Sequence, residues 1–257
     1  DTLTAIAEDK SHVITGEQKC VYFAEQEPEV LEVLQRRAET LHIPYKIYGR
    51  DFHAENIRYT CFGMQFDVEI GDNIYADLQI PLLGEHQAKN CALALAVCVD
   101  VLSDLRRESA VFSLPDIRKN LSLLHWPGRM EVLRSKPFVL LDACINATSC
   151  ENVKEVLRHL GVWNCTVIVG IPEDKDYAGV VRSMKGMANR IILTRSGNPH
   201  YHFSQKQQES LAEEDIGTIW TDSVKQALTL AGSCPDPIVI LGTTSVISEV
   251  EQIFQQS

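Results

Sequence analysis

The second half of the sequence alternates between short apolar runs and amphipathic segments, and this rhythm limits the fold more than any other feature. Continuous apolar strands that alternate with helices are typical of a parallel sheet covered on both faces. With right-handed crossovers, such a segment forms a Rossmann-like doubly wound, mostly parallel sheet. The predicted strands are FVLLD, CTVIVG, RIILT, IGTIWT and PIVILG, and the predicted helices are SCENVKEVLRHL, YAGVVRSMKGMA, SQKQQESLAEE, SVKQALTLAG and SVISEVEQIF.

The first half has a different pattern. Residues 28–42 form a helical stripe with Pro28 at its first position, and residues 85–102 are apolar enough for a buried helix. Residues 64–70 and 73–80 alternate apolar and polar residues across GDN, which predicts an antiparallel hairpin. Pro and Gly interrupt the pattern within residues 123–132. We therefore expect one α/β domain at residues 1–125 and a second at 126–257.

Charge and cysteine usage exclude several classes of protein. The net charge is −11 and no basic block exists, so we expect neither a nucleic-acid nor a membrane partner. No run approaches eighteen apolar residues, and the first ten residues do not resemble a signal peptide. The eight cysteines include no C-x-x-C pair, and several lie in apolar runs. Buried thiols in a reducing cytosol, and hence a cytoplasmic location, are the expectation.

Ligands of open parallel sheets bind beyond the carboxyl ends of the strands. Those ends are Asp142 and the loops 170–176, 194–199 and 242–245. GTTS at 242–245 suits either an anion site or a plain helix cap, and we favour the cap. The HYH sequence at 200–202 favours a polar loop over a metal site, and Lys175 is expected to pair with its loop neighbours. Neither G-x-x-x-x-G-K-[ST] nor G-x-G-x-x-G occurs.

Arg129 follows a Pro-Gly bend, from which an arginine can offer a planar fork to phosphate oxygens, although a solvated surface arginine is the simpler interpretation. Asp142 could likewise be only a strand-ending acid that caps a helix. No catalytic residue is assigned from the sequence.

Several segments in order resemble one family, the folylpolyglutamate and dihydrofolate synthases of the Mur ligase superfamily. The segments are LLGEHQAKNCALALAV, HWPGRMEVL, FVLLDACIN, GIPEDKDYAGVV and IILTRSGNP, and the opening DTLTAIAEDKSHVITGE is similar too. The resemblance implies the last part of a central ATPase domain followed by the C-terminal domain. It implies ATP contacts for Asn90, Arg129 and Asp142, and carbamylation of Lys10 to give an oxygen ligand for Mg²⁺.

The reaction implied by the resemblance is ATP-dependent addition of L-glutamate to folate, with dihydropteroate as another possible acceptor, through an acyl phosphate in a monomeric enzyme. The family's P-loop lysine and upstream Mg²⁺ ligands belong to a region before Asp1, so we expect the isolated chain to be inactive. Ile145 stands where the family usually has histidine. This leaves open an alternative, a catalytically degenerate module with a binding or structural role. A generic Rossmann-like nucleotide binder is a third, less favoured hypothesis.

Overall fold

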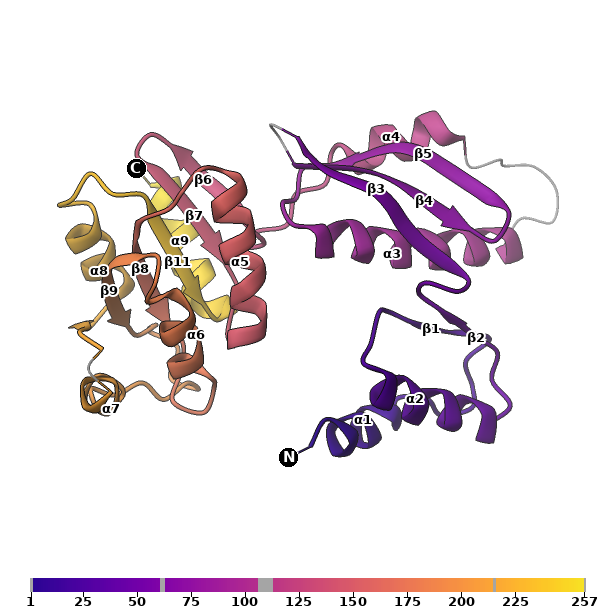
Figure 1. The fold of residues 1–257 in the computed structure, drawn as a ribbon, viewed down its shortest axis with the longest axis horizontal. Helices are drawn as coiled ribbons and strands as arrows, with labels where there is room; N and C mark the ends of the chain where they lie inside the picture. Colours follow the sequence, from indigo (N-terminus) through magenta and orange to yellow (C-terminus); the bar gives the residue numbers. More distant parts are fainter. Residues whose placement is uncertain (1, 61–62, 106–112, 215, 257) are drawn as a thin grey trace. The chain divides into compact units, whose positions relative to one another are not determined.

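The computed structural model describes residues 2–60, 63–105, 113–214 and 216–256. Its contacts divide the chain into two compact units. The first unit comprises Asp1–Pro81 and Glu85–Leu124, and the second comprises Leu82–Gly84 and His125–Ser257. Each unit is described separately below (Figure 1).

The first part of unit 1 is a small layer of two helices and two strands. Helix α1 (Leu3–Ser11) begins after Thr2, whose hydroxyl accepts the Ala5 N–H as an N-cap, and α2 spans Pro28–Thr40. Strands β1 (Val21–Phe23) and β2 (Tyr45–Ile47) pair in parallel. The helix predicted at 28–42 is confirmed. The residues buried between these elements are Ile14, Phe23, Ala38, Ile43 and Ile47.

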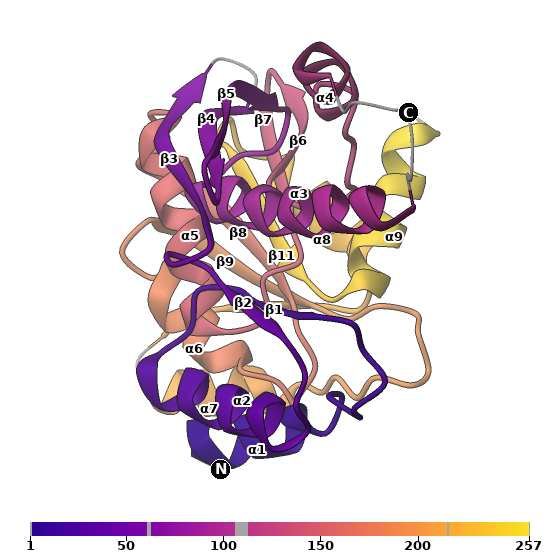
Figure 2. The ribbon, with the colours of Figure 1, turned by 90° about the vertical axis from the view of Figure 1, so that its right-hand side faces the viewer.

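The second part of unit 1 is an antiparallel sheet in the order β3-β4-β5, formed by Phe52–Thr60, Gly63–Ile70 and Asn73–Ile80. Helix α3 (Glu85–Leu105) packs against β3 and β4, and α4 (Leu114–Leu121) packs against β5 (Figure 2). Alternate residues of β4 are buried, from Met64 to Ile70, while those between them are half-buried. The predicted hairpin and helix are confirmed; β3 was not predicted.

Unit 2 contains a six-stranded sheet in the order β10-β9-β8-β11-β7-β6. All neighbouring pairs are parallel except β6 with β7, so the predicted doubly wound, mostly parallel sheet is confirmed. The antiparallel edge strand β6 was not predicted. The strands are β6 (Glu131–Ser135), β7 (Phe138–Asp142), β8 (Cys165–Gly170), β9 (Ala188–Thr194), β10 (Ile219–Thr221) and β11 (Ile238–Gly242).

Helices cover both faces of this sheet. The helices are α5 (Ala147–His159), α6 (Tyr177–Met184), α7 (Lys206–Glu213), α8 (Val224–Ala231) and α9 (Thr244–Gln255). Helices α8 and α9 pack on the face that carries Val139, Leu141 and Ile168. Successive strand residues point to opposite faces, so the intervening buried residues, such as Leu140 and Val167, meet the face where α5 and α6 lie in contact.

The cysteines in the described residues are free thiols: Cys20, Cys91, Cys98, Cys144, Cys150, Cys165 and Cys234. Four of them, Cys91, Cys144, Cys150 and Cys165, are buried, whereas Cys98, in the apolar run 90–100, is exposed against expectation. Cys61 lies outside the described residues. Among the helices that the structure describes, none has both the length and the apolar character needed to cross a bilayer.

Candidate functional site

The turn that carries Arg129 is held by two carboxylates. The Met130 N–H donates to Asp142 Oδ2 at 2.9 Å, and the Gly128 N–H donates to Glu131 Oε2 at 2.8 Å. These bonds lie on either side of Arg129 in the sequence. The backbone of the turn is therefore anchored both to the end of β7 and to the start of β6, the neighbouring strand.

Glycine at position 128 lets this turn lie against α9. Gly128 has φ +64, and a Cβ built there would lie 2.4 Å from Ile247 Cγ2. The Gly128 carbonyl also accepts the Ala143 N–H at 2.8 Å. Met130 has φ +48, in the left-handed region that non-glycine residues seldom adopt. Close packing and hydrogen bonds together hold this conformation.

Asp142 ends β7 with its side chain almost fully buried, at 6% exposure. Burial raises the pKa of the Asp142 carboxyl to about 6. The Met130 N–H, the positive charge of Arg129 and the Cys144 N–H act against this rise in pKa, because each favours the carboxylate. Asp142 and Arg129 are thus neighbours in the same unit, with the carboxylate bound to backbone donors of the protein itself.

The side chain of Arg129 is available for a ligand. The residue is exposed, and in the described part of the chain no carboxylate oxygen lies within 4 Å of its guanidinium. Its backbone is fixed while its cationic end is unpaired. A guanidinium carried on an anchored backbone suits a planar, charge-assisted contact with phosphate or carboxylate oxygens.

The other two predicted site residues belong to unit 1. Asn90 is exposed on the second turn of α3, with its side-chain amide 3.5 Å from Gln87 Oε1. Lys10 lies in the last turn of α1, where its side chain is 76% exposed and its Nζ is 3.2 Å from Asp9 Oδ2. Both side chains point to the surface of their helices. Within unit 2, the structure brings Arg129 and Asp142 together.

The GTTS turn differs from the plain helix cap expected. Thr243 occupies the N-cap position of α9, but its side chain makes no capping hydrogen bond. Its hydroxyl lies 2.9 Å from the Ser245 hydroxyl, which in turn donates to Ser196 at 3.0 Å. Ser196 lies in the loop that follows β9, and Ser245 lies at the start of α9. They join two loops at the carboxyl edge of the sheet.

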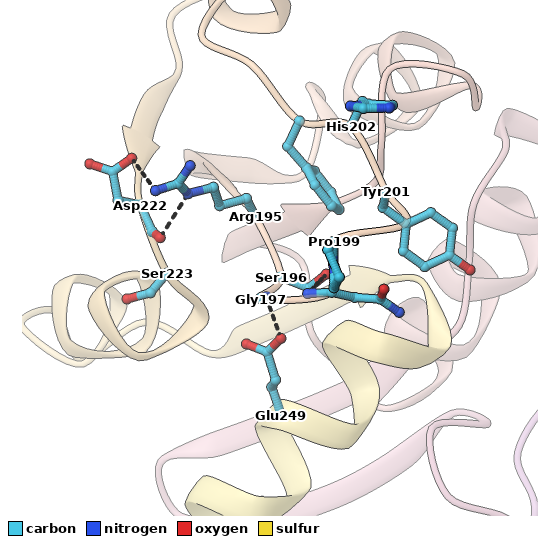
Figure 3. A pocket seen from close by; sticks show the side chains of 11 residues that line it. Arg195, Ser196, Gly197, Pro199, Tyr201, His202, Asp222, Ser223 and Glu249 are labelled. Atoms are coloured by element: carbon cyan, nitrogen blue, oxygen red, sulfur yellow. Dashed lines mark hydrogen bonds and ion pairs between the residues drawn. The ribbon is translucent and has the colours of Figure 1, made fainter.

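A pocket of about 440 Å³ opens beside this hydroxyl chain (Figure 3). Arg195 points across it toward Asp222, with Nε donating to the Asp222 carbonyl at 3.1 Å and an ion pair at 3.5 Å. Glu249 reaches up from α9 and accepts the Gly197 N–H at 2.7 Å. The lining residues are Arg195, Ser196, Gly197, Asn198, Pro199, Tyr201, His202, Phe203, Asp222, Ser223 and Glu249.

The pocket therefore combines a cation, two acids and aromatic side chains at the carboxyl edge of the sheet, the region expected for ligands. The sequence located the loop 194–199 but not Glu249, since a helical acid fifty residues later carries no local pattern. His200 and His202 lie in a loop, as predicted, and His202 lines the pocket.

Two helix starts are joined by Asp176. As the N-cap of α6, it accepts the Gly179 N–H through Oδ1 at 2.9 Å, and its Oδ2 accepts the Ala147 N–H of α5 at 2.9 Å. The sequence indicated Lys175 of this loop rather than Asp176. Lys175 pairs with Asp174 at 3.4 Å, as expected. An aspartate directly before a helical pattern is a capping signal that could have identified Asp176.

Ile145, which stands where the resembled family usually has histidine, lies between β7 and α5. Ile145 is half-buried, and the next residue, Asn146, caps α5 by accepting the Ser149 N–H at 2.8 Å. The asparagine of the motif therefore has a structural role. The apolar Ile145 side chain can neither donate a hydrogen bond nor transfer a proton.

Comparisons with known proteins agree with this fold and arrangement of motifs. Residues 1–98 match the family model of the Mur ligase middle domain. The structure of Mycobacterium tuberculosis folylpolyglutamate synthase complexed with ADP and AMPPCP matches 99% of this chain and 60% of that chain, with a TM-score of 0.87 and 22% identity. This likeness establishes the fold alone, which the chain shares with that synthase.

Similar curated proteins indicate the kind of ligase more specifically. The chain is 26% identical to the folylpolyglutamate synthase of Lacticaseibacillus casei over 252 residues, which are 98% of this chain and 57% of that protein. It is 24% identical over 257 residues to the dihydrofolate synthase/folylpolyglutamate synthase of Bacillus subtilis, again over 98% of this chain and 58% of the relative. The chain is thus a homologue of folylpolyglutamate synthases, as its motifs predicted, and spans less than two thirds of their length.

Proposed function

We propose that the protein to which this chain belongs is an ATP-dependent ligase that adds L-glutamate to folate, with dihydropteroate as an alternative acceptor. In this proposal residues 1–125 are the last part of the central ATPase domain, and residues 126–257 are the C-terminal domain. The observation that carries the proposal is Arg129, an unpaired guanidinium on a turn fixed by Asp142 and Glu131. The homology to folylpolyglutamate synthases supports the same reaction class.

Formation of an acyl phosphate moves a phosphoryl group from ATP to a carboxylate, and the amine of glutamate then displaces phosphate. Negative charge on the transferring group requires cations held in position. Arg129 is suited to this role because its backbone is fixed and its side chain is free. Asp142 contributes by positioning the turn, while the exposed amide of Asn90 offers a polar contact for the nucleotide.

Lys10 suits Mg²⁺ only in a modified form. An ammonium group repels a metal ion, whereas a carbamate supplies the oxygen ligands that Mg²⁺ prefers. Lys10 is exposed, so carbon dioxide can reach its amine, and it lies beside the Asp9 carboxylate. We therefore propose a carbamylated Lys10 that, with Asp9, would hold Mg²⁺, and Mg²⁺ would supply charge neutralisation for the phosphoryl group.

The pocket at residues 195–203 is our candidate binding site for the amino-acid substrate. L-Glutamate carries two carboxylates and one ammonium group. In the pocket, Arg195 would exchange its ion pair with Asp222 for a substrate carboxylate, and the released Asp222 would face the ammonium group. Replacement of Arg195 by alanine is expected to raise the KM for glutamate at least tenfold, because a charge-assisted contact is lost. The KM for folate should remain unchanged.

The direct test is an assay of the full-length protein with a reduced folate, ATP, Mg²⁺ and radiolabelled L-glutamate. The proposal predicts a folate product longer by one glutamate, with one phosphate released per residue added. A full-length protein that forms no such product at any Mg²⁺ concentration would refute the ligase function.

The second candidate function is a catalytically degenerate module that binds a ligand or partner, and Ile145 is the observation that favours it. Ile145→His in the full-length protein distinguishes the two functions. A native protein with ligase activity supports the first. A native protein without activity, unchanged by Ile145→His, supports the degenerate module.

We also propose that this 257-residue chain alone does not turn over ATP, since its sequence has no P-loop of the G-x-x-x-x-G-K-[ST] form. The measurement is phosphate release by the purified chain in ATP and Mg²⁺. A rate well above that of buffer would contradict this part of the proposal.

A further inference from the structure

One histidine and two glutamates converge on the half-buried face of the β3-β4-β5 sheet. His53 on β3 lies directly opposite Glu69 on β4, and Glu55 follows two residues later on β3. Directly opposed residues, and residues two apart in a strand, point to the same face. His53 Nε2 is 3.8 Å from Glu69 Oε2 and 3.9 Å from Glu55 Oε2. One ligand atom from each residue lies within 4.8 Å of the others.

The other acids of this face already have partners. Asp67 accepts hydrogen bonds from the Asn56 side chain and the Asp77 N–H, both at 2.7 Å, and these bonds lower the pKa of its carboxyl. Asp77 lies 3.8 Å from both Arg58 and Arg118.

Glu55 and Glu69 differ from those acids. In the described part of the chain neither has a lysine or arginine within 4 Å, and both converge on one imidazole. Two carboxylates beside one imidazole carry more negative charge than that single ring could balance. The trio therefore has the excess charge and the mixed nitrogen and oxygen donors that a divalent cation would satisfy.

The scaffold beneath the trio is rigid. Phe52, Val68 and Ile70, which alternate with the trio along β3 and β4, are at most 6% exposed. The Ala54 N–H, between His53 and Glu55, donates to the Tyr48 hydroxyl at 3.2 Å. The backbone positions of the three ligands are therefore fixed, and only their side-chain torsions remain adjustable.

We propose that His53, Glu55 and Glu69 bind a first-row divalent metal ion, with Zn²⁺ as the best match. A tetrahedral zinc with bonds of about 2.0–2.1 Å separates its ligand atoms by about 3.4 Å. The present separations of 3.8 and 3.9 Å close to that value through small rotamer changes. Imidazole favours Zn²⁺ over Mg²⁺, so this site is distinct from the one proposed at Lys10. The fourth position faces solvent and would hold water.

The test uses the full 257-residue chain, freed of metal with EDTA, titrated with Zn²⁺ by calorimetry and with Co²⁺ by absorption spectroscopy. We expect one ion per chain with a Kd below about 10 µM, and a thermal midpoint that rises with Zn²⁺. The Co²⁺ spectrum should show weak d–d bands of nitrogen and oxygen ligands, without intense thiolate charge transfer. His53→Ala and Glu69→Gln should each weaken binding at least tenfold.

His200→Ala is the matched control, since His200 is an exposed histidine in unit 2 and should leave metal affinity unchanged. Circular dichroism in EDTA shows whether each variant is folded. If His53→Ala does not fold, Glu55→Gln takes its place. Three results would overturn the proposal: no binding at millimolar metal, equal affinity in folded His53→Ala, or thiolate bands that place the ion on cysteines.

Discussion

The carboxylate of Asp142 accepts a hydrogen bond from the Met130 N–H at 2.9 Å, which ties the end of β7 to the residue after Arg129. The carboxylate is therefore engaged with the protein backbone, and its burial keeps water away from that bond. Asp142 therefore fixes the position of the Arg129 turn.

The first prediction concerns the pH dependence of stability. Burial raises the pKa of Asp142 from 3.8 to about 6, so between these values the native state binds more protons than the unfolded state. The free energy of unfolding must then fall as pH rises through this window, by on the order of 3 kcal/mol in total. Asp142→Asn has no such titration, and its amide oxygen can still accept the Met130 N–H.

Urea unfolding at pH 4, 5, 6 and 7 measures this difference. All three tryptophans, Trp126, Trp163 and Trp220, lie in unit 2, so tryptophan fluorescence reports its unfolding. The stability of the native chain relative to Asp142→Asn should decrease from pH 4 to pH 6. A difference that stays constant with pH, or that increases, would show that the pKa of Asp142 is not raised.

The second prediction concerns Gly128. Its replacement by alanine places a Cβ 2.4 Å from Ile247 in a left-handed backbone conformation. The conformation costs about 1–2 kcal/mol and the steric overlap adds about 1–3 kcal/mol. Gly161→Ala is the matched control, because Gly161 has φ +74 but no atom within 4 Å of the position that an alanine Cβ would take. Equal loss of unfolding free energy in both variants would mean that α9 does not confine the turn.

The third prediction concerns the loop beside the pocket. Glu249→Gln replaces a charged acceptor of the Gly197 N–H with a neutral one, which weakens the bond by about 1 kcal/mol. Hydrogen exchange at the Gly197 amide should become about fivefold faster. Glu209→Gln, on the exposed surface of α7, should leave that rate unchanged. An unaltered Gly197 rate in Glu249→Gln would contradict the prediction.

The sequence predicted the elements of unit 2 well because each buried strand is a continuous apolar run, as in residues 165–170. It missed β3, whose outward residues are polar and whose register shifts between Glu55 and Arg58. The contacts of Asp142 with Met130, and of Ser245 with Ser196, depend on backbone conformation and loop packing. No periodicity encodes such contacts, so the sequence located these residues without showing what they bind.

For the same reason, the sequence alone does not reveal the group of His53, Glu55 and Glu69 in unit 1. His53 and Glu69 are sixteen positions apart, and only the β3-β4 register makes them neighbours. A one-residue slip of that register would place them on opposite faces of the sheet.

The most direct test of the central claim compares the full-length protein with its Arg129→Ala variant. The measured quantity is kcat/KM for ATP-dependent addition of L-glutamate to a reduced folate. Arg36→Ala serves as the control, since Arg36 is an exposed arginine on α2 whose ion-pair partner is Glu32. If the Arg129 guanidinium neutralises the transferring phosphoryl group, Arg129→Ala should lower kcat/KM about 100-fold while Arg36→Ala leaves it unchanged. An Arg129→Ala enzyme within twofold of the native value would contradict the account.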